Sequence, residues 1–134
     1  MKKGNLILSL LCVCLSYMAC QTKEDNPEIA IIGTWEAVTR YGNDGVGNDY
    51  SVDIAPANRY TLHFMDNNQF TTTQTNYPSC IGQWRIHQDN NLFFTFPCQT
   101  AWQETRIILD LNCDELLLAE TGCDEGCAIK FRKK

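Results

Sequence analysis

Short segments with alternating apolar and polar residues follow one another from residue 30 to the end of the chain. Alternation places every second side chain on the same face, which is typical of strands with one buried face. Runs rich in Gly, Asn and Asp separate these segments, and no segment keeps a helical period. The pattern predicts strands over residues 33–41, 60–64, 70–75, 81–87, 92–96, 106–111, 116–120 and 128–133.

Strands this short, joined by tight turns, favour an antiparallel up-and-down meander. Closing the meander into a barrel of about eight strands removes its exposed edges, so we expect a small all-β barrel, with a small sandwich as the alternative. Alternation also predicts which side chains point inward. These are Trp35, Leu62, Phe64, Phe70, Trp84, Phe94, Phe96, Ile107, Leu109, Leu111, Leu116, Leu118, Ile129 and Phe131.

The first residues have a different pattern. Two lysines follow Met1, and an apolar run over residues 6–19 comes next. This run is too short to span a bilayer comfortably and has the shape of a secretory signal peptide, which we assign to residues 1–19. The exported location that it implies is oxidising, which favours disulfides.

The run ends Tyr17-Met18-Ala19-Cys20, which resembles the lipobox of bacterial lipoproteins. That resemblance implies a lipid on Cys20 and attachment to a membrane. Residues 21–25, Gln-Thr-Lys-Glu-Asp, resemble the export signal of lipoproteins displayed on Gram-negative outer membranes. We therefore expect a lipid-anchored protein on the cell surface, with a polar tether over 20–29 and the barrel domain over 30–134. The alternatives are simple secretion or an uncleaved anchor for the leader, and a generic solvated tether for residues 21–25.

Two G-x-W motifs, Gly33-Thr34-Trp35 and Gly82-Gln83-Trp84, lie at two of the predicted strands. Their order, with a phenylalanine strand on each side of an Asp-Asn turn, resembles the lipocalin-like domains of small bacterial lipoproteins over residues 31–134. A tryptophan at each motif can plug one barrel end, and the glycine lets another backbone pass close by.

A barrel of this size is either filled by side chains or holds one small ligand. For a small apolar ligand, the lining candidates are Trp35, Phe64, Trp84, Phe94 and Phe96, and Thr72 and Gln74 offer polar inward positions at a pocket mouth. The alternative is a packed barrel that serves as a protein-interaction or structural module, with no partner that can be named.

Removal of residues 1–19 leaves five cysteines besides Cys20. Cys80 and Cys98 lie opposite each other in a predicted hairpin, and a bridge there would contribute roughly 3 kcal/mol. Cys123 and Cys127 flank the last turn and form the second expected pair, which leaves Cys113 unpaired. The meander places Cys80, Cys98, Cys123 and Cys127 at the same end of the barrel. The competing arrangement is therefore a swapped pairing among these four cysteines.

Charge and motifs exclude several functions. Without Lys2 and Lys3 the chain has 9 basic and 16 acidic residues, a net charge of −7, which argues against nucleic acid. No nucleophile elbow, phosphate-binding loop or metalloprotease motif occurs, so we expect no catalytic residue and no cofactor.

The spacing of the cysteines does not fit a zinc site. Asp44, Asn48, Asp49 and Asp53 fail calcium-loop spacing, so a polar turn is favoured. His63 and His87 are expected to face solvent.

Overall fold

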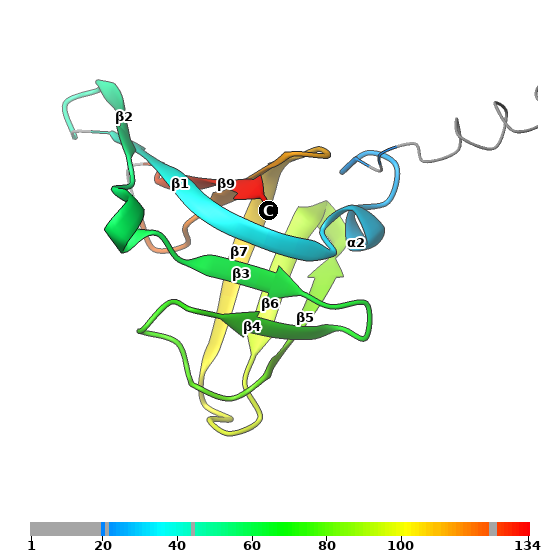
Figure 1. The fold of residues 1–134 in the computed structure, drawn as a ribbon. Coiled ribbons are helices and arrows are strands. Elements are labelled where there is room, and N and C mark those ends of the chain that lie inside the picture. The colour runs from blue at the N-terminus through cyan, green and yellow to red at the C-terminus, as the bar shows by residue number, and fades with distance from the viewer. Residues whose placement is uncertain (1–19, 21, 44, 124–125) are drawn as a thin grey trace, which may run out of the picture.

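The protein is described by a computed structural model of residues 20, 22–43, 45–123 and 126–134 (Figure 1). The predicted signal peptide at 1–19 lies outside these residues. Strands follow one another in one antiparallel meander. Their bounds are β1 Gly33–Asn43, β2 Asp49–Asp53, β3 Thr61–Phe64, β4 Gln69–Thr72, β5 Gly82–His87, β6 Asn91–Thr95, β7 Gln103–Leu111, β8 Glu115–Ala119 and β9 Ala128–Lys133. Short helices are α2 Pro27–Ala30, η2 Pro56–Asn58 and η3 Gln88–Asn90.

The sheet closes on itself because β1 pairs with both β3 and β9. The result is an eight-stranded antiparallel barrel, as the alternation predicts. The ninth strand, β2, pairs only with the second half of β1 and extends the sheet beyond the barrel wall. Strand β1 ends at Asn43 and β2 begins at Asp49, so a short connection joins them.

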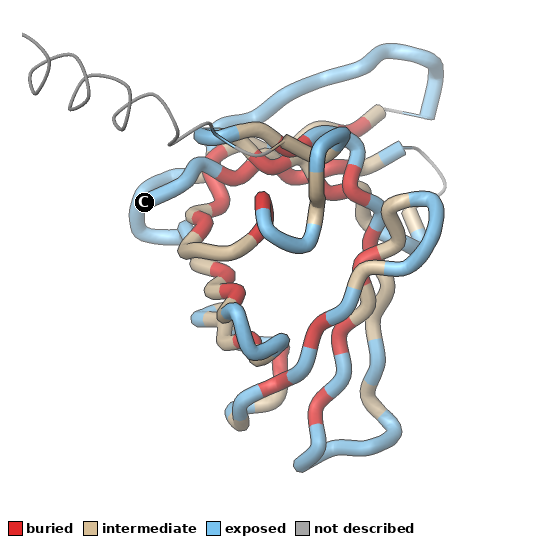
Figure 2. Tube along the Cα trace, turned by 90° about the vertical axis from the view of Figure 1, so that its right-hand side faces the viewer, coloured by how far each residue is buried: buried red, intermediate tan, exposed pale blue. Residues whose placement is uncertain are grey.

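Helix α2 covers one end of the barrel, and Figure 2 looks onto this end from outside. Asn26 caps the helix by accepting a hydrogen bond from the Ile29 amide, and Pro27 occupies the first turn. Ile31 is fully buried, and its carbonyl accepts a 2.7 Å hydrogen bond from the Trp35 indole. The Trp84 indole donates to the Met65 carbonyl at 3.2 Å. Both tryptophans thus close the barrel, as the G-x-W motifs predict.

The barrel interior near this end is packed with aromatic rings. Phe70 contacts Phe64 and Phe94 with ring centroids 5.5 and 4.8 Å apart. A Cβ on Gly82 would lie 2.9 Å from Phe96 and 3.0 Å from Phe70, so glycine leaves room for these rings. It also leaves room for the Thr95 carbonyl of the neighbouring strand, which would lie 3.0 Å away, as expected for a close backbone approach.

Strand β7 differs from its predicted pattern. Ile107 and Leu109 are 40% and 46% exposed, whereas Ile108 is 1% exposed. The prediction that Ile107 and Leu109 point inward is therefore wrong. A β-bulge lies between Ile108 and Asp110, and its extra residue shifts the alternation so that Leu111 still points inward.

Two disulfides lie at the barrel end opposite α2, and they match the expected pairs. Cys80 pairs with Cys98 at a Cα–Cα distance of 6.3 Å, which ties the loop before β5 to the loop after β6. Cys123 pairs with Cys127 across the last turn. We call this end the open end, because α2 covers the other one.

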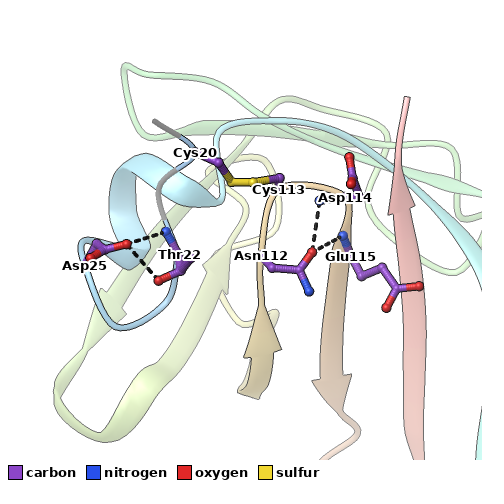
Figure 3. Close-up of a disulfide and its surroundings, with 7 residues drawn as sticks. All are labelled: Cys20, Thr22, Asp25, Asn112, Cys113, Asp114 and Glu115. Carbon is purple, nitrogen blue, oxygen red and sulfur yellow. Dashed lines mark hydrogen bonds between the residues drawn. A yellow bond between two sulfur atoms is a disulfide. The ribbon is translucent and has the colours of Figure 1, made fainter. Parts of the chain in front are cut away.

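A third disulfide joins Cys20 to Cys113 in the turn between β7 and β8 (Figure 3). In this structure Cys113 is paired, against the expectation that it stays unpaired, because the N-terminal segment folds back onto the barrel. The Lys23 amide donates to the Leu111 carbonyl at 3.0 Å. Asn112 organises the turn by accepting hydrogen bonds from two backbone amides that follow it.

The expected tether over residues 20–29 is therefore not a free spacer in this structure. The Lys23 side chain donates a further hydrogen bond to the Leu109 carbonyl at 3.0 Å. Thr22 and Asp25 are joined by hydrogen bonds that form a local turn (Figure 3). Among the residues described, no helix has the length and apolar character needed to cross a membrane.

Candidate functional site

The five aromatic residues expected to line a ligand pocket form part of the packed core. Each is at most 3% exposed. Phe64 contacts both Trp84 and Phe94, with ring centroids 5.7 and 6.0 Å apart. Trp35 lies under α2, and Phe96 packs against Tyr77 and Trp102 at the open end. These side chains fill the barrel, which leaves the open end as the place for a candidate site.

A buried polar cluster occupies the interior near the open end. Arg106 of β7 is only 3% exposed, and its guanidinium Nε lies 2.5 Å from a Glu104 carboxylate oxygen. Its Nη2 donates to the Tyr77 hydroxyl at 2.9 Å, and that hydroxyl donates to the other Glu104 oxygen at 2.6 Å. These three side chains form a closed ring of hydrogen bonds, which we call the Arg106 cluster.

The register explains why a charged residue is buried here. Arg106 lies directly opposite Leu92, and Glu104 lies opposite Phe94. Directly opposed residues share one face of the sheet, and Leu92 and Phe94 are both buried. Both charged side chains must therefore point into the barrel, where the ion pair offsets part of the cost of their burial.

Three buried polar atoms in this region make no hydrogen bond of good geometry among the described residues, although the Tyr60 hydroxyl lies close enough to Arg106 for the two side chains to interact. They are the Arg106 Nη1, the Tyr60 hydroxyl and the Gln74 Oε1, and all are buried. A buried polar atom without a partner is destabilising by about 1–3 kcal/mol. Arg106 belongs to β7, Tyr60 precedes β3 and Gln74 follows β4, and water or a ligand can supply the partners of such atoms.

The charges of this region act on one another. Burial raises the pKa of Tyr77, and the positive charge of Arg106 offsets part of this rise. Burial also raises the pKa of Tyr60, and the charge and hydrogen bond of Arg106 offset part of this rise. Burial works to lower the pKa of Arg106, but its contacts with Tyr77 and Glu104 raise it. The guanidinium is therefore charged, and both phenols are neutral, at physiological pH.

Tyr60 connects the cluster to a hollow under β2. This hollow has a volume of about 500 Å³ and is open to solvent. Its apolar wall comes from Tyr50, Val52 and Ile54, and Arg40 and Tyr60 form polar parts of its lining. Tyr50 and Val52 are 47% and 56% exposed. They lie opposite Gly42 and Arg40 of β1, so β2 continues the inner face of the barrel outward.

Gln74 and Tyr60 also border a second hollow on the other side of η2, of about 350 Å³. The η2 turn, with Asn58, lies between the two hollows and contributes to both. The inward position predicted for Gln74 thus places its side chain at the edge of this second hollow. The hydroxyl of Thr72, the other residue predicted there, donates to the Thr61 carbonyl at 2.9 Å.

Sequence reasoning missed Arg106, Glu104 and Tyr77. The alternation in β7 was assigned to the wrong face, which placed Arg106 outside. One signal was available. Continuing the pairing of β6 with β7 from inward Phe94 would have placed Glu104, and two residues later Arg106, inside the barrel.

The histidines and the described residues weighed for calcium lie in exposed positions or have ordinary polar contacts. His63 accepts or donates one hydrogen bond with the Thr34 hydroxyl at 2.8 Å, and His87 is exposed. In the described part of the chain, no group of three His, Cys, Asp or Glu side chains is arranged to hold a metal. Of the residues weighed for calcium, Asp44 lies outside the described residues, and Asp53 accepts a hydrogen bond from Thr39.

The structure therefore defines a closed antiparallel barrel with an aromatic core and a polar open end. No family model matches the sequence. No curated protein matches it either. Among solved structures, it is similar to a lipocalin-like protein from Bacteroides uniformis ATCC 8492. The two share 15% identity over 78% of this chain and 99% of that chain, with a TM-score of 0.44.

Proposed function

We propose that this protein is a non-enzymatic binding barrel that takes up a small molecule at its open end. The observation that carries the proposal is the position of Tyr60, whose ring lines a hollow that is open to solvent and whose buried hydroxyl reaches back to Arg106. The adjoining hollow of about 500 Å³ supports it, because small-molecule sites have volumes of about 300–1,000 Å³. An apolar wall with a few convergent polar groups is also typical of such sites.

Native mass spectrometry of protein purified from its host tests this proposal. We expect a co-purifying small molecule with wild type, and none with Ala55→Trp, which fills the hollow from an exposed position. Ala101→Trp is the matched control, because Ala101 is also exposed and lies in the loop before β7. The same bound mass on all three proteins would place the ligand elsewhere, and no bound mass on any would contradict the proposal.

We also propose that the protein is exported and anchored to the outer membrane, exposed at the cell surface, through a lipid on Cys20. Support comes from the signal-peptide pattern at 1–19 and the lipobox-like residues 17–20. The lipid would be attached to the same sulfur that pairs with Cys113 in the structure. One sulfur cannot carry both bonds, so the anchored form would have Cys113 as a free thiol.

Membrane fractionation and thiol labelling distinguish these two forms. We expect the wild type in the membrane fraction with Cys113 reactive toward a maleimide, and Cys20→Ala in the soluble fraction. A soluble wild type that yields the Cys20–Cys113 disulfide peptide would overturn the anchor. Cys20→Ala that stays membrane-bound and uncleaved would overturn the assignment of Cys20.

A packed interaction or structural module remains the second candidate. The filled aromatic core favours it, because a protein with a solid interior needs no ligand to be stable. It is supported if the native mass spectrum of wild type shows the bare chain.

A further inference from the structure

We infer that the α2 end of the barrel lies against a lipid bilayer, held there by the segment that follows Cys20, and that the open end faces away from the bilayer. This inference rests on the proposed lipid at Cys20 and goes beyond it, because a lipid anchor on a free tether would leave the barrel in any orientation. The interacting surface consists of helix α2 and the turn that contains Cys113. Its partner is the head-group layer of the membrane.

The segment after Cys20 is bound to the barrel by hydrogen bonds. The Lys23 amide donates to the Leu111 carbonyl at 3.0 Å, and the Lys23 ammonium donates to the Leu109 carbonyl at 3.0 Å. Both acceptors belong to the last residues of β7, at the α2 end. These bonds involve no sulfur atom, so they are compatible with a lipid on Cys20.

The same segment also folds on itself. The Thr22 amide and hydroxyl both donate to the Asp25 carboxylate, at 3.1 and 2.9 Å (Figure 3). The Thr22 carbonyl accepts hydrogen bonds from the amides of Asp25 and Asn26. Asn26 then caps α2, and this helix buries Ala30 in the core. The chain is therefore held against the barrel from Thr22 onward.

These contacts limit how far the anchor can reach from the barrel. Cys20 and Lys23 are three positions apart, and an extended chain spans at most about 3.5 Å per residue, so Cys20 lies within about 10 Å of Lys23. In the structure the Cα atoms of Cys20 and Cys113 are 5.5 Å apart. The head-group layer on each side of a bilayer is about 5–8 Å thick. A lipid on Cys20 thus brings the α2 end to the head groups.

The open end then lies on the side of the barrel that faces water. Strand β7 runs for nine residues from Gln103 at the open end to Leu111 at the α2 end. At about 3.4 Å per residue and a tilt of about 40°, this strand spans about 20 Å along the barrel axis. The hollow lined by Tyr50 and Val52 therefore opens into the aqueous phase, and a ligand would enter it from water rather than from the bilayer.

The surface around Cys20 has an apolar side chain suited to the head-group layer. Ile29 of α2 is 55% exposed. It shares a hollow of about 250 Å³ with Cys20, Ala30, Cys113 and Lys133. The first carbons of a lipid on Cys20 would leave the protein along this hollow, where Ile29 can contact them.

Charge does not determine this orientation. The α2 end has the cations Lys23 and Lys133, and it also has the anions Glu28 and Asp114. The chain after residue 19 has a net charge of −7, with 9 basic and 16 acidic residues. An anionic bilayer would not attract such a protein, so the short reach of the anchor positions the barrel. A neutral bilayer is therefore the appropriate test surface.

Fluorescence quenching in vesicles tests the inference. The lipidated protein is purified from its host and placed in phosphatidylcholine vesicles that contain a phospholipid with a nitroxide on its head group. A maleimide dye is attached at Asp114→Cys for the α2 end or at Ala101→Cys for the open end, each combined with Cys113→Ser. Both positions are exposed and lie between strands. We expect severalfold stronger quenching at position 114, because a nitroxide quenches only at short range.

An insertion tests the role of the segment. Ten Gly and Ser residues between Gln21 and Thr22 would leave the contacts of Thr22 and Lys23 in place and add about 17 Å of flexible reach. Quenching at position 114 should then fall to the level at position 101. The same ten residues between Thr100 and Ala101 are the control, and they should leave quenching at position 114 unchanged.

The outcomes separate this inference from the proposed anchor. Equal quenching at the two positions of a membrane-bound protein would overturn the orientation and leave the anchor intact. Stronger quenching at position 101 would do the same, because the open end would then face the bilayer. An insertion after Gln21 that leaves quenching at position 114 unchanged would overturn the role of the segment. A wild type found only in the soluble fraction would overturn the anchor and the orientation together.

Discussion

Replacing Arg106 by Met should be the most damaging single change at the open end. The side chain is 4% exposed, and it donates to Glu104 and Tyr77 at 2.5 and 2.9 Å. Methionine has a similar volume, so little packing is lost. The carboxylate of Glu104 would be left without its cation in a largely apolar interior.

Removing one partner of a buried ion pair costs about 3–5 kcal/mol. The Glu104 side chain is 24% exposed, so solvent screens part of its charge. We therefore expect a loss of about 3 kcal/mol in the free energy of unfolding. The double variant Arg106→Met/Glu104→Gln should recover part of this loss, because no unpaired charge remains.

Urea unfolding, followed by tryptophan fluorescence, measures these differences. Arg132→Met is the control at an exposed position of β9, and its effect should stay within about 0.5 kcal/mol. A loss below about 1 kcal/mol for Arg106→Met would refute the buried ion pair. So would a double variant that is less stable than Arg106→Met alone.

Three other predictions test separate parts of the structure. The pKa of Tyr77 is raised above 10.0 in the folded state, so its stabilisation is complete below about pH 10 and is lost as pH rises further. The free energy of unfolding of wild type should thus fall above pH 10 by up to about 1.4 kcal/mol per pH unit more steeply than that of Tyr77→Phe, and parallel slopes would contradict this. Replacing Cys80 and Cys98 together by Ser should cost about 3 kcal/mol in urea unfolding, and an unchanged midpoint would argue against the bond. Ile108→Asn should cost more than about 3 kcal/mol and Leu109→Asn less than about 0.5 kcal/mol, so equal effects would contradict the bulge in β7.

The sequence predicted the fold well because strand alternation and turn residues are local signals. The strand order follows from a meander with short connections, and the G-x-W motifs identified the two tryptophans that close one end. The β-bulge in β7 was not predictable by simple alternation, since one extra residue exchanges the two faces without changing the composition.

The candidate site was predicted less well for the same reason. Reading Ile107 as an inward residue placed Arg106 outside, so the charged cluster could not be anticipated. Tyr77 lies in a loop, where no periodic pattern indicates direction. The contact between Cys20 and Cys113 joins residues separated by 93 positions, and only the folded chain shows that they meet.

The most direct test of binding at the open end is a crystal structure of the protein purified from its host. We predict a bound small molecule in the hollow lined by Tyr50, Val52 and Tyr60. An empty hollow, or a molecule bound only on the outer face of the barrel, would contradict the account.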